Sequence, residues 1–153
     1  MDHKERQKLV EQRAMNAQTV QFVAEQQEEM AELALEQAHK APGWVAVAQA
    51  ERARAETLME VAQEESRLAT AIAMGTEPEG AVAADERELR KDLLEIARAE
   101  SSLIQDVLAL SAEDDATMIA LQEQAGRNCD LLRHVAQTAT EADLHLHFDS
   151  PEK

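Results

Sequence analysis

The chain of 153 residues has very few aromatic residues: two Phe, one Trp and no Tyr, which together make 2% of the sequence. It also has only four Gly, three Pro and one Cys, Cys129. A single cysteine excludes an internal disulfide and a zinc site built from several thiolates. The core must therefore come from Ala, Leu, Val, Ile and Met, and the scarcity of turn residues predicts a few long helices.

Cations are also scarce, because 15 Lys and Arg stand against 31 Asp and Glu, which gives a formal net charge of −16. Such an acidic surface repels phosphate backbones, so we expect no nucleic-acid partner, while a basic protein would be attracted. The charged N-terminal sequence predicts no signal peptide, and no apolar run reaches the length of a membrane span. We therefore expect a cytoplasmic protein that makes no membrane contact.

Three breaks divide the chain. Pro42-Gly43 is the first, and the segment GTEPEG at residues 75–80 is the second. The third has no Gly or Pro, but Ser111 and Asp114 have the spacing of a capping box, which would start a new helix. These breaks predict four helices, over residues 3–40, 44–74, 84–110 and 113–146. The alternative is one uninterrupted helix in place of the last two.

Apolar residues recur at three- and four-residue spacing in every segment, which is the period of an amphipathic helix. In the first segment the stripe is rich in Ala, and the larger residues expected to widen it are Phe22, Met30, Leu33 and Leu35. The last two segments contain heptads in which Glu100 and Asn128 fall in or beside the apolar seam. We predict an all-α fold: an elongated antiparallel four-helix bundle of coiled-coil-like hairpins in one domain, residues 1–147, with a disordered tail over 148–153. Alternatively, the hairpins complete their core as a homodimer.

One short pattern points to metal chemistry. Glu36 and His39 have the Glu-x-x-His spacing that carboxylate-bridged metal centres place on one helical face. Glu65 and Glu100 would be the further ligands of a ferritin-like bundle, whose ferroxidase activity is the one enzymatic alternative. The second Glu-x-x-His is missing, and the first falls in the last turn of its expected helix. We therefore predict a structural corner with no cofactor, in which Trp44 seals one end of the bundle.

No pattern of a catalytic nucleophile, a phosphate-binding loop or paired catalytic carboxylates is present, which indicates a non-enzymatic protein. The last expected helix has a broad apolar stripe, and such width on an amphipathic helix favours docking of a partner helix. The residues expected to make this contact are Leu121, Leu131, Leu132, Val135 and Leu144. Closure of the chain's own core, or of a homodimer, is the alternative explanation for the same stripe.

The segment LQEQAGRNCDLLRHVAQTATEADLHL, residues 121–146, resembles the C-terminal helix of flagellar hook-junction export chaperones. The matching positions are Asn128, Leu131, Leu132 and Thr138 to Thr140. The segment LMEVAQEESRL, residues 58–68, is similar to the Glu-rich first helix of that family. The resemblance, over residues 58–146, implies a helix that wraps the terminal helices of secreted hook-associated proteins.

The apolar stripe and the missing catalytic patterns predict an adaptor or export-type chaperone that binds another protein, either basic or helical. Two alternatives belong to other classes. One is the ferritin-like metal-binding bundle, and the other is an acidic mimic that inhibits a nucleic-acid-binding protein.

Overall fold

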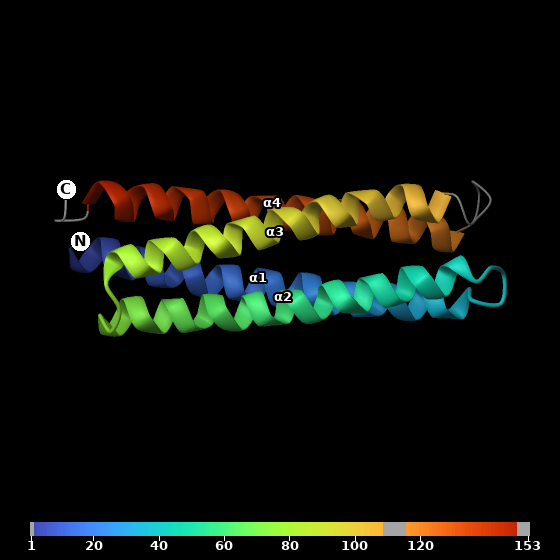
Figure 1. Cartoon of the computed structure of the whole chain (residues 1–153), viewed down its shortest axis with the longest axis horizontal. Coiled ribbons are helices and arrows are strands. Elements are labelled where there is room, and N and C mark those ends of the chain that lie inside the picture. The colour runs from blue at the N-terminus through green and yellow to red at the C-terminus, as the bar shows by residue number, and fades with distance from the viewer. Residues whose placement is uncertain (1, 109–115, 150–153) are drawn as a thin grey trace.

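The four predicted helices are present in the computed structural model, and they form an elongated bundle (Figure 1). The structure describes the backbone of residues 2–108 and 116–149, and the side chains within these ranges except those of residues 79, 104, 107, 108 and 139–149. The helices are α1 (His3–Glu36), α2 (Gly43–Met74), α3 (Glu79–Leu108) and α4 (Ala116–Asp149). Over these described ranges, no helix contains an apolar stretch long enough to cross a membrane.

Local features explain where α1 begins and where α2 ends. At the start of α1, the Asp2 side chain accepts a hydrogen bond from the Glu5 backbone N–H at 2.8 Å, and the Glu5 carboxylate accepts one from the Asp2 N–H at 3.0 Å. This capping box satisfies two backbone donors that the helix itself leaves unpaired. α2 is followed by Gly75, whose φ of 64° lies in the left-handed region that glycine adopts without strain.

The remaining boundaries differ from the expected ones by a few residues. α1 ends at Glu36 rather than at residue 40, and α3 begins at Glu79 rather than at residue 84. α4 continues to Asp149 and so includes residues 148 and 149 of the predicted tail. The break between α3 and α4 confirms two helices, whereas the capping pair Ser111 and Asp114 lies outside the described residues.

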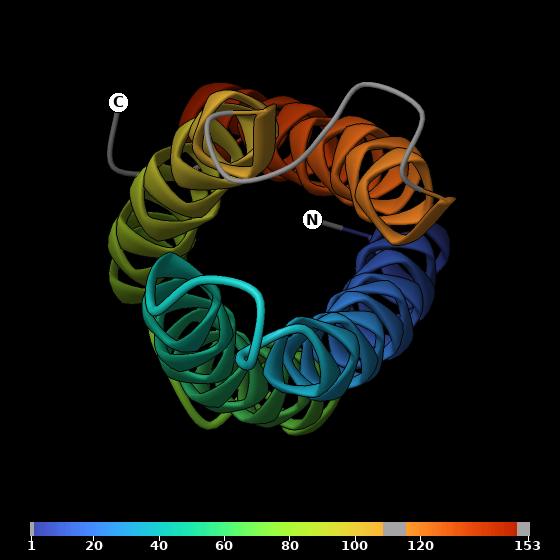
Figure 2. The same ribbon diagram turned by 90° about the vertical axis from the view of Figure 1, so that its right-hand side faces the viewer.

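The helices pair as two antiparallel hairpins, α1 with α2 and α3 with α4. Each hairpin packs far more extensively within itself than against the other, and the contacts between hairpins are those of α1 with α4 and of α2 with α3. Seen along the bundle, the four helices form a ring in chain order (Figure 2). The start of α1 and the far end of α4 lie at the same end as the α2–α3 connection (Figure 1). The interface between the two hairpins is therefore less extensive than the interface within either hairpin.

Two apolar clusters form the core. The larger one joins all four helices through residues such as Val20, Leu58, Leu93 and Leu132, and each of these four side chains is fully buried. The second surrounds Trp44, which is also fully buried, as predicted for the residue that seals this end of the bundle. The seam residues of the sequence are thus the core residues of the structure.

The prediction that four larger residues widen the apolar stripe of α1 was wrong for three of them. Met30 is buried, but Phe22, Leu33 and Leu35 are 49%, 38% and 36% exposed. Small Ala residues form much of the α1 seam, and they allow a close approach of neighbouring helices. Phe22, Leu33 and Leu35 therefore lie on the side of α1 that faces solvent.

The two hairpins repeat one burial pattern. α2 contains LMEVAQ, in which Leu58, Val61 and Ala62 are buried, and α4 contains LRHVAQ, in which the corresponding Leu132, Val135 and Ala136 are buried. Buried residues of α1 also correspond to buried residues of α3 at a constant separation in the sequence. The corresponding residues are Val20 and Leu93, Val23 and Ile96, and Ala24 and Ala97. Arg13 and Glu86, which have the same spacing of 73 residues, are in direct contact. Among these equivalent positions, Arg13 and Glu86 therefore meet inside the bundle.

Candidate functional site

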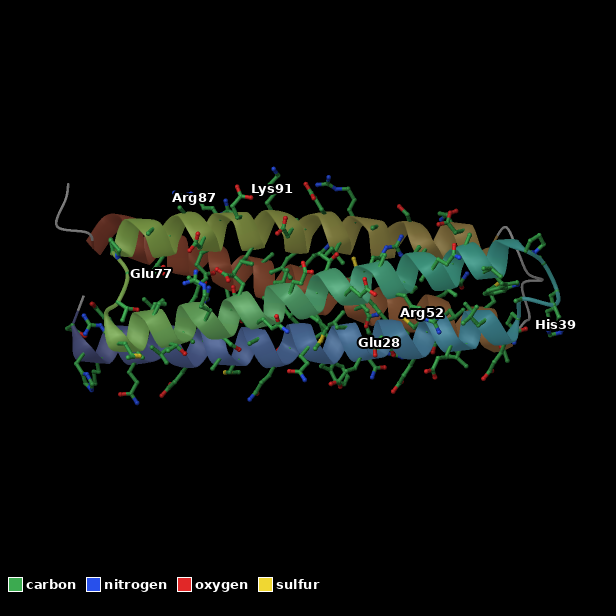
Figure 3. All side chains as sticks on the ribbon, turned by 60° about the horizontal axis from the view of Figure 1, so that its bottom comes forward. Glu28, His39, Arg52, Glu77, Arg87 and Lys91 are labelled. Carbon is green, nitrogen blue, oxygen red and sulfur yellow. The ribbon has the colours of Figure 1, made fainter. Side chains whose placement is uncertain are left out.

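The four candidate metal ligands do not come together. Glu36 and His39 are exposed at the end of α1, where the His39 ring nitrogen Nδ1 lies 3.1 Å from the Glu36 carbonyl oxygen. Figure 3 shows His39 at the α1–α2 connection, beyond the end of the bundle. Glu65 and Glu100 are completely buried, but each belongs to a different polar layer inside the bundle. These layers are the chief polar feature of the interior.

The first of them, the Arg13 layer, consists of Arg13, Glu65 and Glu86. Its guanidinium is completely buried and contacts the Glu86 carboxylate through Nη1. The same group lies 3.8 Å from Glu65, between Arg13 Nε and a carboxylate oxygen, and donates from Nη2 to the Thr138 carbonyl oxygen at 3.4 Å. One side chain of α1 thereby connects α2, α3 and α4.

The second, the Arg54 layer, consists of Arg54, Glu51, Glu100 and Asn128. Arg54 Nη1 donates to Glu51 at 2.5 Å and to Glu100 at 3.4 Å. The second oxygen of Glu100 accepts a hydrogen bond from the Asn128 amide at 3.1 Å. Glu100 and Asn128, the two polar residues expected in or beside the seam, are thus buried and bonded to each other. This layer connects α2, α3 and α4.

Each layer holds two carboxyl groups for one guanidinium. Burial raises the pKa of Glu51 to about 9, with a further contribution from the neighbouring Glu100 carboxyl. Burial and the charge of Glu86 raise the pKa of Glu65 to about 8, although the Arg13 charge acts in the opposite direction. Burial also raises the pKa of Glu86. Near neutral pH the raised pKa values of Glu51 and Glu65 therefore favour the protonated form of these two carboxyls.

This arrangement explains why the layers are poor cation sites. A guanidinium already occupies the position between the two carboxyl groups in each layer. Glu51 and Glu65 stand 14 positions apart in α2, which separates the layers by roughly 21 Å at ~1.5 Å per helical residue. Within the described part of the chain, no three His, Cys, Asp or Glu side chains form a group that could hold a metal ion.

The candidate partner-binding residues of α4 lie mostly in the core. Leu121, Leu132 and Val135 are at most 1% exposed, and Leu131 is half-buried at the edge of the larger cluster. The side chain of Leu144 lies outside the described residues. A partner could therefore reach Leu131 on the closed bundle, but it would reach the three buried residues only if the hairpins moved apart.

The single cysteine, Cys129, lies in the core between α3 and α4. Cys129 is buried, and its thiol donates a hydrogen bond to the Ala97 carbonyl oxygen at 3.3 Å. Burial raises the pKa of this thiol, which disfavours the reactive thiolate. His134, the histidine nearest to it in sequence, is exposed on α4. The two side chains thus lie in different environments.

Sequence reasoning missed Arg13, Glu51 and Glu86 as interior residues. A signal was present, because Glu86 precedes Leu89 and Leu93 at the spacing of the apolar seam. The pairing of the charged residues could not be predicted, because the sequence of one helix does not show which charged residue of another helix lies opposite. No protein-family model, curated protein or solved structure matches this chain.

Proposed function

We propose that this chain is a non-enzymatic helical bundle that binds another protein through α4, as an adaptor or export-type chaperone does. In the bound form the α1–α2 hairpin moves away from the α3–α4 hairpin, and an amphipathic helix of the partner packs on the exposed apolar face of α4. Leu121, Leu132 and Val135 form the centre of this face, and Leu131 forms its edge. The same function was expected from the resemblance of residues 58–146 to hook-junction export chaperones.

The polar interface between the hairpins is the observation that carries the proposal. Arg13 of α1 crosses to Glu86 of α3, and Arg54 of α2 reaches Glu100 of α3. Buried ion pairs contribute little net stability, because desolvation of the charges offsets their attraction; replacing them with apolar residues is often neutral or stabilising by about 1–4 kcal/mol. These polar contacts thus specify the alignment of the hairpins at a small gain in free energy, beside the apolar cluster that joins all four helices.

Unpaired polar atoms in the layers further lower the cost of separation. Among the described residues, both carboxylate oxygens of Glu65, one of Glu51 and one of Glu86 are buried without a hydrogen-bond partner. Both polar atoms of the Gln27 amide share this condition. A buried polar group of this kind costs on the order of 1–3 kcal/mol, which is recovered when the group meets water. Opening the bundle between the hairpins regains part of this free energy.

Leu131 provides a direct test, because it belongs to the proposed face yet contributes only partly to the core. We expect Leu131→Glu to reduce capture of the partner from the native host by at least about tenfold, which corresponds to about 1.4 kcal/mol of binding free energy. The matched control is Leu94→Glu on α3, where an apolar side chain that is 39% exposed is replaced in the same way. The bound proteins would be identified and quantified by mass spectrometry.

Helix content and thermal stability of both variants would be measured alongside capture, so that loss of fold is separated from loss of binding. Equal capture by the folded Leu131→Glu variant and by the wild-type chain would rule out α4 as the binding surface. A loss of capture by Leu94→Glu alone would place the surface on α3.

A further inference from the structure

The solvent-facing side of α1 is more apolar than its place on the surface requires. Four of the seven large apolar side chains exposed among the described residues belong to this helix. Met15, Phe22 and Leu33 are 61%, 49% and 38% exposed. Their positions fall close to multiples of the helical repeat, so they lie along one side of α1. Phe22 is an aromatic residue in a chain that has almost none, and aromatic side chains are enriched in protein interfaces.

Charges of opposite sign lie at the two ends of this stripe. Lys4 and Lys8 are exposed in the first and second turns of α1, on the same side as Met15. Toward the other end, α1 has five glutamates and no Lys or Arg; they are Glu25, Glu28, Glu29, Glu32 and Glu36. Glutamates at four-residue spacing repel one another on a helix. The acidic end therefore gains from cations that another molecule supplies.

We infer that this side of α1 is a self-complementary surface that binds α1 of a second copy of the chain in antiparallel orientation. We call it the α1 outer face and define it by Lys4, Lys8, Met15, Phe22, Glu29 and Leu33. A two-fold axis between residues 18 and 19 brings its parts into register. Met15 then lies level with Phe22 of the second copy, Lys8 with Glu29, and Lys4 with Leu33.

This register matches the apolar Met15 with Phe22 and the cation Lys8 with the anion Glu29 in both halves of the interface, while Lys4 falls level with the apolar Leu33. Antiparallel pairing also places the positive end of one helix dipole beside the negative end of the other. The net charge of −16 on each chain opposes association. At physiological ionic strength that repulsion is screened beyond about 8 Å, so the pairs at the interface decide the outcome. The surface is separate from the buried face of α4, so the binding of a partner to α4 and this pairing can be tested independently.

Charge exchange at Lys8 and Glu29 tests both the surface and the register. In Lys8→Glu, each pair of the dimer becomes glutamate against glutamate; in Glu29→Lys, each becomes lysine against lysine. We expect the dissociation constant of each variant alone to rise on the order of tenfold, since two pairs are lost per dimer. An equal mixture of the two variants forms heterodimers in which both pairs are again of opposite charge, so dimerisation returns.

The measurement is sedimentation velocity of the full chain over a range of concentrations, in which the wild-type species moves toward twice the chain mass of 16.9 kDa. Phe22→Glu is expected to remain at the mass of one chain, while the control Leu94→Glu dimerises as the wild type does. Far-UV circular dichroism checks that every variant is folded. A wild-type chain that stays monomeric up to millimolar concentration overturns the inference. So does a dimer that Phe22→Glu and Lys8→Glu leave unchanged, or a mixture that fails to recover.

Discussion

Replacing Glu51 by glutamine should stabilise the protein above neutral pH, although it removes one partner of an apparent ion pair. The Glu51 carboxyl is completely buried, 2.5 Å from Arg54, and shares that guanidinium with Glu100. Burial and the neighbouring Glu100 raise its pKa from 4.5 to about 9. A glutamine amide has the shape of the protonated carboxyl, can still accept from Arg54 and carries no charge that needs a proton.

The magnitude follows from the two pKa values. A carboxyl whose pKa is higher in the folded chain contributes stability that is fully present below its unfolded pKa and is lost as the pH rises through its folded pKa. For Glu51 this window extends from 4.5 to about 9. Each pH unit within it costs about 1.4 kcal/mol, so at about pH 7.5 the proton uptake by Glu51 amounts to a cost on the order of 4 kcal/mol. Glu51→Gln removes this cost.

Urea unfolding followed by far-UV circular dichroism, at several pH values between about 5.5 and 8, would measure the effect. We expect the stability of the wild-type chain to fall with pH, and its slope to become shallower by about 1.4 kcal/mol per pH unit in Glu51→Gln. Glu56→Gln, an exposed position on the same helix, is the control and should change stability by at most about 0.5 kcal/mol. The reasoning fails if Glu51→Gln is less stable than the wild type at about pH 8 and keeps the wild-type slope, since Glu51 would then be an ionised partner of Arg54.

Further predictions concern the core, the helix ends and metal binding. Trp44→Ala should lower the free energy of unfolding by about 3–5 kcal/mol, because the fully buried indole leaves a cavity; a loss below about 1 kcal/mol in urea would contradict this packing. Gly75→Ala should lower the free energy of unfolding by about 1–2 kcal/mol, because the φ of Gly75 is positive. Gly126→Ala within α4 should instead raise it by about 0.5–1 kcal/mol. Thermal unfolding compares the two variants, and equal effects would contradict a left-handed conformation of Gly75 at the end of α2. Chelator treatment should leave the thermal midpoint unchanged, because Arg13 and Arg54 occupy the cation positions of the layers, and stoichiometric iron, manganese or zinc in the purified chain would refute that view.

The helices could be predicted because their signals are local. Pro42-Gly43 marks the start of α2 and Gly75 follows its end. The three- and four-residue spacing of apolar residues marked the seams that are buried in the structure. Glu100 and Asn128 could be placed in or beside the seam by the same periodicity, and Trp44 by its size and its position after a break. Each of these inferences required only one segment of the chain.

The flanks of the seams and the pairing of charges could not be predicted. Phe22 lies at a spacing that would widen the apolar stripe, but only the positions of the neighbouring helices show that it faces solvent. Arg13 and Glu86 are far apart in sequence and meet because the two hairpins align at equivalent positions. The choice of α4 residues for partner binding had the same weakness, since Leu132 and Val135 belong to the core of the closed bundle.

The central claim is that the hairpins separate so that α4 can bind a partner, and a reversible cross-link between α1 and α4 tests it most directly. The side chains of Asn16 and Thr138 meet at 3.2 Å, so cysteines at these two positions, with Cys129→Ser, would join the hairpins on oxidation. Ala97→Cys with the native Cys129 is the control, because that bond would form within the α3–α4 hairpin, where the thiol already contacts Ala97. Mass spectrometry would verify both bonds before capture of the partner is measured.

We predict that oxidation abolishes capture by the Asn16→Cys, Thr138→Cys chain, that reduction restores it, and that the oxidised control still binds. Undiminished capture by the oxidised chain that joins α1 to α4 would contradict the claim, because the partner would then bind the closed bundle.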